Sequence, residues 1–317
     1  MGRAIREQYR DRSLFLHRSL KSARVDELVK DVSQLSDNDF DWAIEGLGIS
    51  RDALKRIESK GIRKTTVFCH PGVLCERPEL ISYYRNIVGL TQKGLSKLAV
   101  HTSSYERGVH TSLGEHRALT ISNAVNNLMC SILLSDDSFA DNDVLRNLVA
   151  SLGITLDGSW RNKVGEKATR EVRSLFHSYL KERGFLKKST SASLTLAGGT
   201  VVRFSSDPDV AILGDDKKLK VAIEVKGGID EAGALERYGA AKKSFDKARK
   251  QNVRVHTIYL ASCITQTVRQ NIEVDGLVSE IQDLLEVLSN PKKARQFLDD
   301  LFEHIVRVKK DPDGHID

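Results

Sequence analysis

The residues of this sequence best suited to chemistry are two acids and a lysine, Asp209, Glu224 and Lys226. Residues 220–226 read Lys-Val-Ala-Ile-Glu-Val-Lys, and this alternation of apolar residues predicts a β-strand. Because successive side chains of a strand point to opposite faces, the three branched apolar residues would be buried on one face. Glu224 and Lys226 would then lie side by side on the other face, so a carboxylate and an ammonium are expected to meet there.

Asp209 begins a second predicted strand, residues 210–213, directly after Asp207-Pro208. If the two strands pair, the carboxylates of Asp209 and Glu224 come close together, and they would repel each other unless a divalent cation lay between them. Mg²⁺ is the expected ion, because it prefers oxygen ligands and takes one or two protein carboxylates plus a phosphate oxygen. The sequence therefore predicts a Mg²⁺ site held by Asp209 and Glu224.

Such a site fits the hydrolysis of a phosphodiester, which needs an activated water, a Lewis acid and relief of developing negative charge. Lys226 would orient or polarise the water and stabilise that charge. The alternative is a simple ion pair between Glu224 and Lys226 at the edge of a strand. Other matches in the chain, Pro312-Asp313 and Glu58-x-Lys60, lack strand alternation, which favours the catalytic interpretation of the Asp209 set.

Pro-Asp followed after a gap by Glu-x-Lys resembles the signature of the PD-(D/E)xK nucleases. The resemblance implies a mixed central β-sheet flanked by helices, and a further acid on the helix that precedes the sheet. Glu166, which follows Gly165, matches the Gly-Glu pattern of some relatives and is our candidate. The helical wheel instead favours Glu171, which lies nearer the apolar stripe.

Further segments, residues 78–85, 92–94 and 227–239, resemble the XcyI-type group of type II restriction endonucleases. This resemblance implies a sequence-specific endonuclease that acts as a homodimer on double-stranded DNA. It also implies a short GC-rich palindrome resembling CCCGGG as the target, since a two-fold protein matches a two-fold site. A DNA methyltransferase is expected in the same restriction-modification system.

The distribution of charge agrees with a polyanionic partner. The net charge is +6, with nine Lys or Arg against three Glu in residues 161–188 and seven basic against three acidic residues in 231–254. In the second stretch we expect Arg237 to read guanine and three lysines to contact phosphates. These lysines are Lys242, Lys243 and Lys247. The alternative for Arg237 is a surface salt bridge with Glu231 or Glu236.

The chain divides into a helical N-terminal domain, residues 1–150, with a role in DNA recognition or dimerisation left open, and a catalytic α/β domain with C-terminal helices, residues 151–317. Residues 89–97 suggest a short helix pair capped by Thr91, which is either a helix-turn-helix reader or a packing unit. We expect breaks in the helical pattern at 135–143 and 153–160. In the catalytic domain we then expect a helix at 162–183, a helix at 232–250 and helices from 262 to the end. The strands are expected at 193–196, 200–204, 210–213, 220–226 and 253–261.

Other classes of protein are disfavoured. The apolar runs are shorter than the roughly 20 residues of a membrane span, and no secretory segment is visible, so we expect a cytoplasmic protein. Four scattered cysteines predict neither a disulfide framework nor a zinc site. Two rival functions remain: a repair or junction-resolving nuclease on the same scaffold, and a DNA-binding protein whose nuclease site is vestigial.

Overall fold

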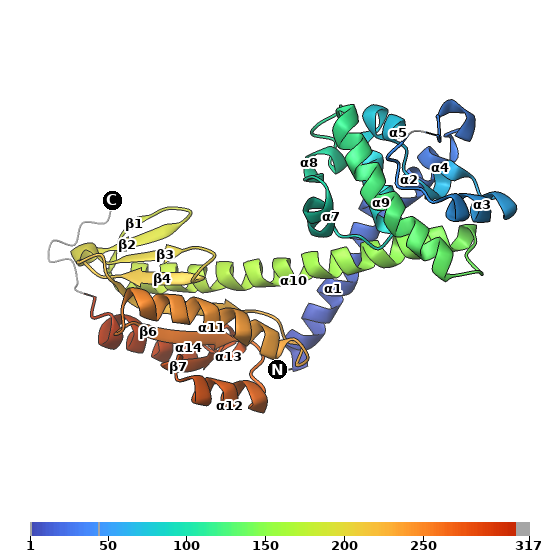
Figure 1. The fold of residues 1–317 in the computed structure, drawn as a ribbon. Helices are drawn as coiled ribbons and strands as arrows, with labels where there is room; N and C mark the ends of the chain where they lie inside the picture. Colours follow the sequence, from blue (N-terminus) through green and yellow to red (C-terminus); the bar gives the residue numbers. More distant parts are fainter. Residues whose placement is uncertain (1, 44, 309–317) are drawn as a thin grey trace. The chain divides into compact units, whose positions relative to one another are not determined.

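The computed structural model describes residues 2–43 and 45–308, with side chains from residue 6 onward. The chain forms two compact units, each with its own hydrophobic core (Figure 1). The helical unit is Asp11–Trp160, and the sheet unit comprises the described residues of Met1–Arg10 and Arg161–Asp317. The division at residue 150 that the sequence suggested lies inside a helix.

The helical unit is built from short helices around one long apolar helix. The helices of the N-terminal half of the chain are α1 (Gly2–Ser22), α2 (Val25–Ser33), η1 (Asp37–Asp39), α3 (Arg51–Ser59), α4 (Lys64–Val67), α5 (Pro71–Glu76), η2 (Pro78–Leu80), α6 (Ile81–Ile87), α7 (Gln92–Leu98), α8 (Ser103–Glu106) and α9 (Glu115–Ser135). Thr91 caps α7 by accepting a hydrogen bond from the amide of Gly94, as expected, but residues 89–97 contain this one helix and not the expected helix pair.

Helix α9 passes a length and composition test for a membrane-spanning segment, although we expected no such segment. Several of its apolar residues, however, lie in the core of the helical unit, where Ile121, Val125 and Met129 are fully buried. The central helix of a folded domain passes the same test, so packing within the unit accounts for its composition.

Helix α10 (Asp141–Glu182) is continuous, so the break predicted at 153–160 was wrong, whereas the break predicted at 135–143 is present as the loop 136–140 between α9 and α10. Isolated glycines lower helix stability by about 1 kcal/mol each relative to alanine, but they do not end a helix. Gly153 and Gly158 have open space where a Cβ would stand, and no proline interrupts the run. The sequence signal for a break was therefore only a local weakening of helix propensity.

The sheet unit contains a single seven-stranded mixed sheet in the order β1-β2-β3-β4-β5-β6-β7. The strands are β1 (Leu186–Ser189), β2 (Ser193–Leu196), β3 (Val201–Phe204), β4 (Val210–Leu213), β5 (Leu219–Lys226), β6 (His256–Ala261) and β7 (Glu280–Asp283). Pairing is antiparallel from β1 to β5 and parallel from β5 to β7. The expected fold class, a mixed sheet flanked by helices, is confirmed.

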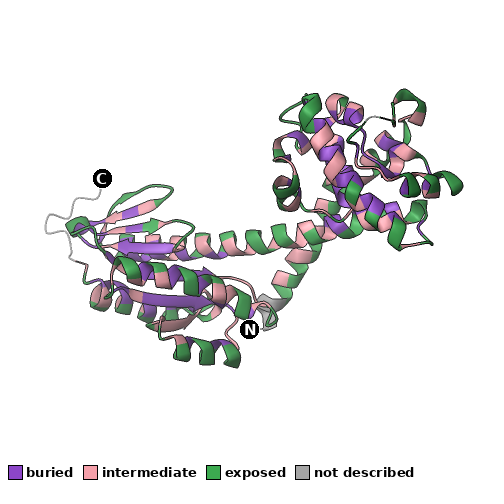
Figure 2. Cartoon of the chain, in the orientation of Figure 1, coloured by how far each residue is buried: buried purple, intermediate pink, exposed green. Residues whose placement is uncertain are grey.

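The two faces of the sheet are covered differently. One face, with Val221, Ile223 and Val225 of β5, packs against the second half of α10 and the C-terminal helices. The other face carries small residues, among them Ala211 and Ala222, and packs against α11 (Ala234–Gln251). The remaining helical segments are η3 (Ala197–Gly199), α12 (Gln266–Asp275), α13 (Leu284–Ser289), α14 (Pro291–Asp299) and η4 (Asp300–Ile305). The central strands are buried between these layers (Figure 2).

Two edge strands, β1 and β7, escaped prediction, and the expectation of helices from 262 to the end was wrong at β7. Strand β1 reads Leu-Lys-Lys-Ser and β7 reads Glu-Ile-Gln-Asp, so neither has the apolar alternation of a half-buried strand. Charged and polar side chains are typical of sheet edges, because they discourage pairing with other chains. Only pairing with β2 and β6 defines these two strands.

Phe176 of α10 is fully buried, and its ring lies 5.2 Å from that of Phe302 and 6.3 Å from that of Phe297. Phe176→Ala should lower the free energy of unfolding by about 3–5 kcal/mol, because it leaves a cavity in the core of the sheet unit. Chemical denaturation monitored by circular dichroism measures this loss. Ser178→Ala, an exposed change on the same helix, should stay within about 0.5 kcal/mol of the parent; equal losses would refute the assignment of this core.

Candidate active site

Asp209, Glu224 and Lys226 converge at the ends of β4 and β5. The register pairs Val210 with Ile223, so Asp209 stands opposite Glu224 on the face that also carries Lys226. The Nζ of Lys226 donates to Asp209 Oδ2 at 3.0 Å and to Glu224 Oε2 at 2.5 Å. Asp209 Oδ2 also accepts the amide of Val225 at 2.8 Å. The expected juxtaposition of two acids and an amine is therefore present.

These three groups are largely withdrawn from water. The side chain of Glu224 is 4% exposed, and those of Asp209 and Lys226 are 19% and 18% exposed. Burial raises the pKa of Glu224 to about 7, against the lowering effect of Lys226, and the nearby Asp209 raises it further. Burial alone would lower the pKa of Lys226, but the two carboxylates together raise it. One ammonium is thus shared by two carboxylates.

The donor set fits a hard divalent cation. When both acids are ionised, the cluster carries one uncompensated negative charge. Oε1 of Glu224 is buried and has no hydrogen-bond partner among the described residues. Among the described residues no three His, Cys, Asp or Glu side chains gather as a ligand set, and the carboxylates that meet at this point are those of Asp209 and Glu224. This number suits Mg²⁺, which usually completes its shell with water and phosphate oxygens.

Two glycines after β5 allow other elements to approach. A Cβ on Gly227 would lie 2.7 Å from Cβ of Ala168 and 3.0 Å from the carbonyl oxygen of Val164, so α10 packs directly against this residue. A Cβ on Gly228 would lie 2.8 Å from the guanidinium of Arg237. The space beside these two glycines is therefore filled by a helix and an arginine.

Sequence reasoning assigned no role to Asp207 or Ser244, which lie beside the cluster. Asp207 forms an ion pair of 2.8 Å with Lys247 of α11, and this contact, more than that with Ser244, lowers its pKa. Ser244 is buried, and its hydroxyl lowers the pKa of both Asp207 and Glu224 without forming a hydrogen bond of standard geometry to either. The helical spacing to Lys247 could have placed Ser244 on this face, but nothing in the sequence marked its burial.

Tyr259 is a second residue that sequence reasoning missed. It is the parallel register partner of Glu224 on β6, and it is fully buried. Burial raises the pKa of Tyr259 to about 12. Its hydroxyl finds no hydrogen-bond partner within the described residues. Glu224, Ser244 and Tyr259 thus each carry a buried polar atom that no other described residue satisfies.

The residues expected to contact DNA lie on α11 with different partners. Arg237 donates to Asp230 Oδ1 at 2.9 Å, so its acidic neighbour is Asp230 and neither of the two glutamates considered from the sequence. Lys242 pairs with Asp275 at 2.7 Å. Lys243 is exposed, and it has no ion pair among the described side chains. Lys243 is thus a readily available cation on this helix.

The two candidates for an auxiliary acid, Glu166 and Glu171, both project from α10 into solvent. Glu166 is 69% exposed and lies 3.6 Å from Arg170, an ion pair within one turn of the helix. Neither glutamate is among the groups that shift the pKa of Glu224. The structure therefore brings neither acid into the cluster around Lys226.

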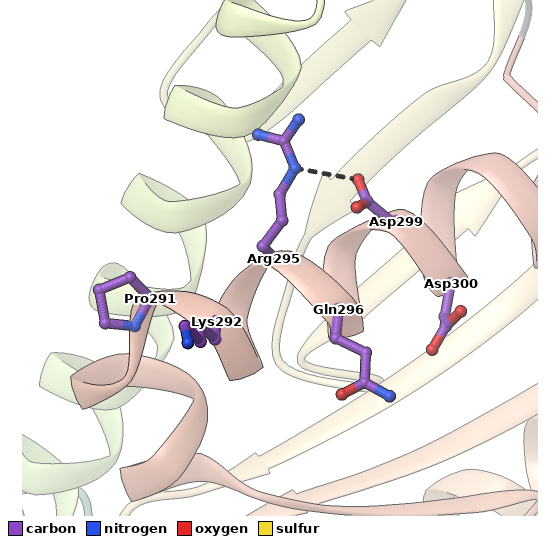
Figure 3. Close-up of a pocket in the computed structure, with 6 residues that line it drawn as sticks. All are labelled: Pro291, Lys292, Arg295, Gln296, Asp299 and Asp300. Carbon is purple, nitrogen blue, oxygen red and sulfur yellow. Dashed lines mark ion pairs between the residues drawn. The ribbon is translucent and has the colours of Figure 1, made fainter.

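A shallow pocket lies elsewhere in the sheet unit, along α14 and η4 (Figure 3). Its wall includes Arg295 and Asp299, which face each other across a 3.2 Å ion pair. The guanidinium of Arg295 also lies over the ring of Tyr179 at 5.3 Å. None of the predicted site residues lines this pocket, and its charged groups attach α14 to the end of α10.

The raised pKa of Glu224 predicts how stability depends on pH. The folded state holds this proton up to about pH 7, whereas an ordinary glutamate releases it near 4.5, so stability falls as pH rises between these values. Glu224→Gln removes that penalty. In EDTA, the difference in unfolding free energy between Glu224→Gln and the parent should shift in favour of the variant by about 3 kcal/mol between pH 4 and pH 8. Thermal melts across this range test the prediction, which a pH-independent difference would contradict.

The sequence of this chain is similar to those of known restriction enzymes. The profile of the family described as XcyI restriction endonuclease matches residues 16–301. The type II restriction enzyme XcyI of Xanthomonas campestris pv. cyanopsidis is 25% identical over 215 residues, which cover 62% of this chain and 63% of that protein. The type II restriction enzyme Cfr9I of Citrobacter freundii is also 25% identical over 215 residues, covering 63% of this chain and 65% of that protein. The aligned region therefore spans somewhat less than two thirds of either relative. Because the family profile matches most of the length of this chain, the chain belongs to the XcyI restriction endonuclease family.

Proposed function

We propose that this protein is a type II restriction endonuclease that hydrolyses phosphodiester bonds of double-stranded DNA in a Mg²⁺-dependent reaction in the cytoplasm. The observation that carries the proposal is the convergence of Asp209, Glu224 and Lys226 in a chain of this family. Two relatives that bear the name of type II restriction enzymes support it.

Asp209 and Glu224 would hold the metal ion, which supplies a Lewis acid for the scissile phosphate and lowers the pKa of a bound water. Lys226 donates to both carboxylates, at 3.0 and 2.5 Å, so its ammonium lies next to the groups that would hold the metal ion. It would orient the attacking water and stabilise the negative charge that grows on the phosphoryl oxygens. We retain Glu166 as the proposed auxiliary acid, with Glu171 as the alternative; either would have to act from the solvent-exposed side of α10.

Helix α11 would supply contacts to DNA. Lys242, Lys243 and Lys247 suit phosphates, which position a duplex without reading its sequence. Arg237 would bridge O6 and N7 of guanine after release from Asp230. The helical unit is proposed to assist in DNA recognition or dimerisation.

The target and the assembly follow from the resemblance to the XcyI group. We propose a homodimer that cuts a short GC-rich palindrome resembling CCCGGG, because a two-fold protein presents its two active sites symmetrically to a two-fold site. A DNA methyltransferase of the same system would protect the host copies of that palindrome. No direct contact between the two proteins is required.

Plasmid digestion by the purified protein tests the reaction. With Mg²⁺ it should yield discrete fragments whose ends map to one palindrome, and with EDTA it should yield none. Asp209→Asn and Lys226→Ala should each lower the cleavage rate at least 10³-fold while duplex binding is largely kept, because they remove stabilisation of the transition state.

The rival functions predict different outcomes of this digestion. Cutting confined to branched substrates would identify a repair or junction-resolving nuclease. An Asp209→Asn variant with the activity and metal affinity of the parent would identify a vestigial site. Random fragments from an intact plasmid would contradict sequence-specific restriction.

Lys243 gives a prediction for the DNA contacts. In an Asp209→Asn background, Lys243→Ala should weaken binding to cognate and non-cognate duplexes equally. It should also reduce the magnitude of the slope of log affinity against log salt concentration by about one. Arg237→Ala should instead reduce the ratio between the two affinities. Lys292→Ala, on α14 at the opposite face of the sheet, is the control and should change neither quantity. Fluorescence anisotropy measures all three; a Lys243→Ala variant that alters only cognate binding would contradict a phosphate contact.

A further inference from the structure

Ser244 carries a buried hydroxyl that contacts among the described residues do not explain. Ser244 is 7% exposed in the middle of α11, and its Oγ has no hydrogen-bond partner among the described residues. An unsatisfied buried hydroxyl costs about 1–3 kcal/mol. Alanine would avoid this cost and would also suit the helix better. This serine therefore carries a polar atom that no described residue satisfies.

Its neighbours on α11 place Ser244 over the ends of β4 and β5. Ala241, one turn before it, packs with Tyr259, and Ala248, one turn after it, packs with Ala222. Lys247, three residues on, reaches Asp207 at 2.8 Å. Since these contacts lie on either side of Glu224 in the sheet, the hydroxyl of Ser244 faces the acidic cluster. The effect of Ser244 on the pKa of Glu224 agrees with this position.

Glu224 can accept a further hydrogen bond from the hydroxyl of Ser244. Its Oε2 accepts from Lys226, while Oε1 is buried and unpaired among the described residues. Asp207, the other carboxylate near Ser244, already has an ion pair with Lys247. Lys226 is shared with Asp209, and it would be repelled by a divalent cation bound to the same carboxylates. Glu224 then needs a second donor to keep its orientation.

We propose that Ser244 is a positioning residue whose hydroxyl, unpaired among the described residues, donates a hydrogen bond to the Glu224 carboxylate when a metal ion binds and thereby holds that carboxylate in place. Hydrogen bonds to metal-ligating carboxylates orient them, and removing such a donor commonly lowers metal affinity 10- to 100-fold. This inference rests on the proposed function of Glu224 as a metal ligand. Ser244 itself contacts neither the metal nor the DNA.

Binding of Mn²⁺ to the full-length protein, followed by electron paramagnetic resonance without DNA, tests the role of Ser244 directly. Ser244→Ala should raise the dissociation constant for Mn²⁺ about tenfold while the melting temperature stays the same or rises. The Mg²⁺ concentration for half-maximal plasmid cleavage should rise by the same factor, with the rate recovered at saturating Mg²⁺. Ser122→Ala, which removes another buried serine hydroxyl in the core of the helical unit, is the control and should leave Mn²⁺ affinity unchanged.

The outcomes separate this inference from the proposed function. If Ser244→Ala binds Mn²⁺ like the parent while Asp209→Asn loses it, the positioning role is wrong and the proposed metal site stands. A lower melting temperature for Ser244→Ala, or an equal loss of Mn²⁺ affinity in Ser122→Ala, also overturns the positioning role. If Asp209→Asn keeps both Mn²⁺ affinity and cleavage, the proposed function itself fails.

Discussion

One ammonium shared by two carboxylates is the interaction on which the site depends. Lys226 lies within hydrogen-bond distance of Asp209 and Glu224, and each acid would otherwise repel the other at the ends of adjacent strands. Glu224 can be withdrawn from water in its charged form only while a cation is close. Strand pairing and the alternation of side chains bring the three residues to the same face of the sheet. The glycines after β5 let α10 and Arg237 pack close to them.

The sheet separates stability from chemistry by using its two faces differently. Branched and aromatic residues fill the face toward α10 and the C-terminal helices, where no charge is needed. The face toward α11 instead uses alanines, which let the helix approach closely enough for a short side chain such as Ser244 to reach the level of Glu224. Long cations on the same helix, including Lys243, extend outward from it. One helix thus carries both a buried hydroxyl and a basic surface.

The three central residues of the site could be predicted because alternation along β5 fixes which side chains share a face. The cap Thr91 and the strands β2, β4 and β5 were also predictable, since each leaves a local pattern in the sequence. What could not be predicted depends on partners far away in the sequence. The pairs Lys247 with Asp207 and Lys242 with Asp275, and the unpaired hydroxyl of Ser244, have no local signature. The edge strands β1 and β7 are likewise defined by their neighbours alone.

The antiparallel hairpin of β4 and β5 has a consequence for how distant relatives are recognised. Asp209 and Glu224 face each other across the ladder, so the turn between the strands can lengthen or shorten without moving either acid. The separation of Glu224 and Lys226 is different, since adding one residue inside β5 would turn one of them toward the apolar side. Insertions should therefore accumulate in that turn during evolution, and a fixed interval between the two acids is the wrong criterion for aligning homologues.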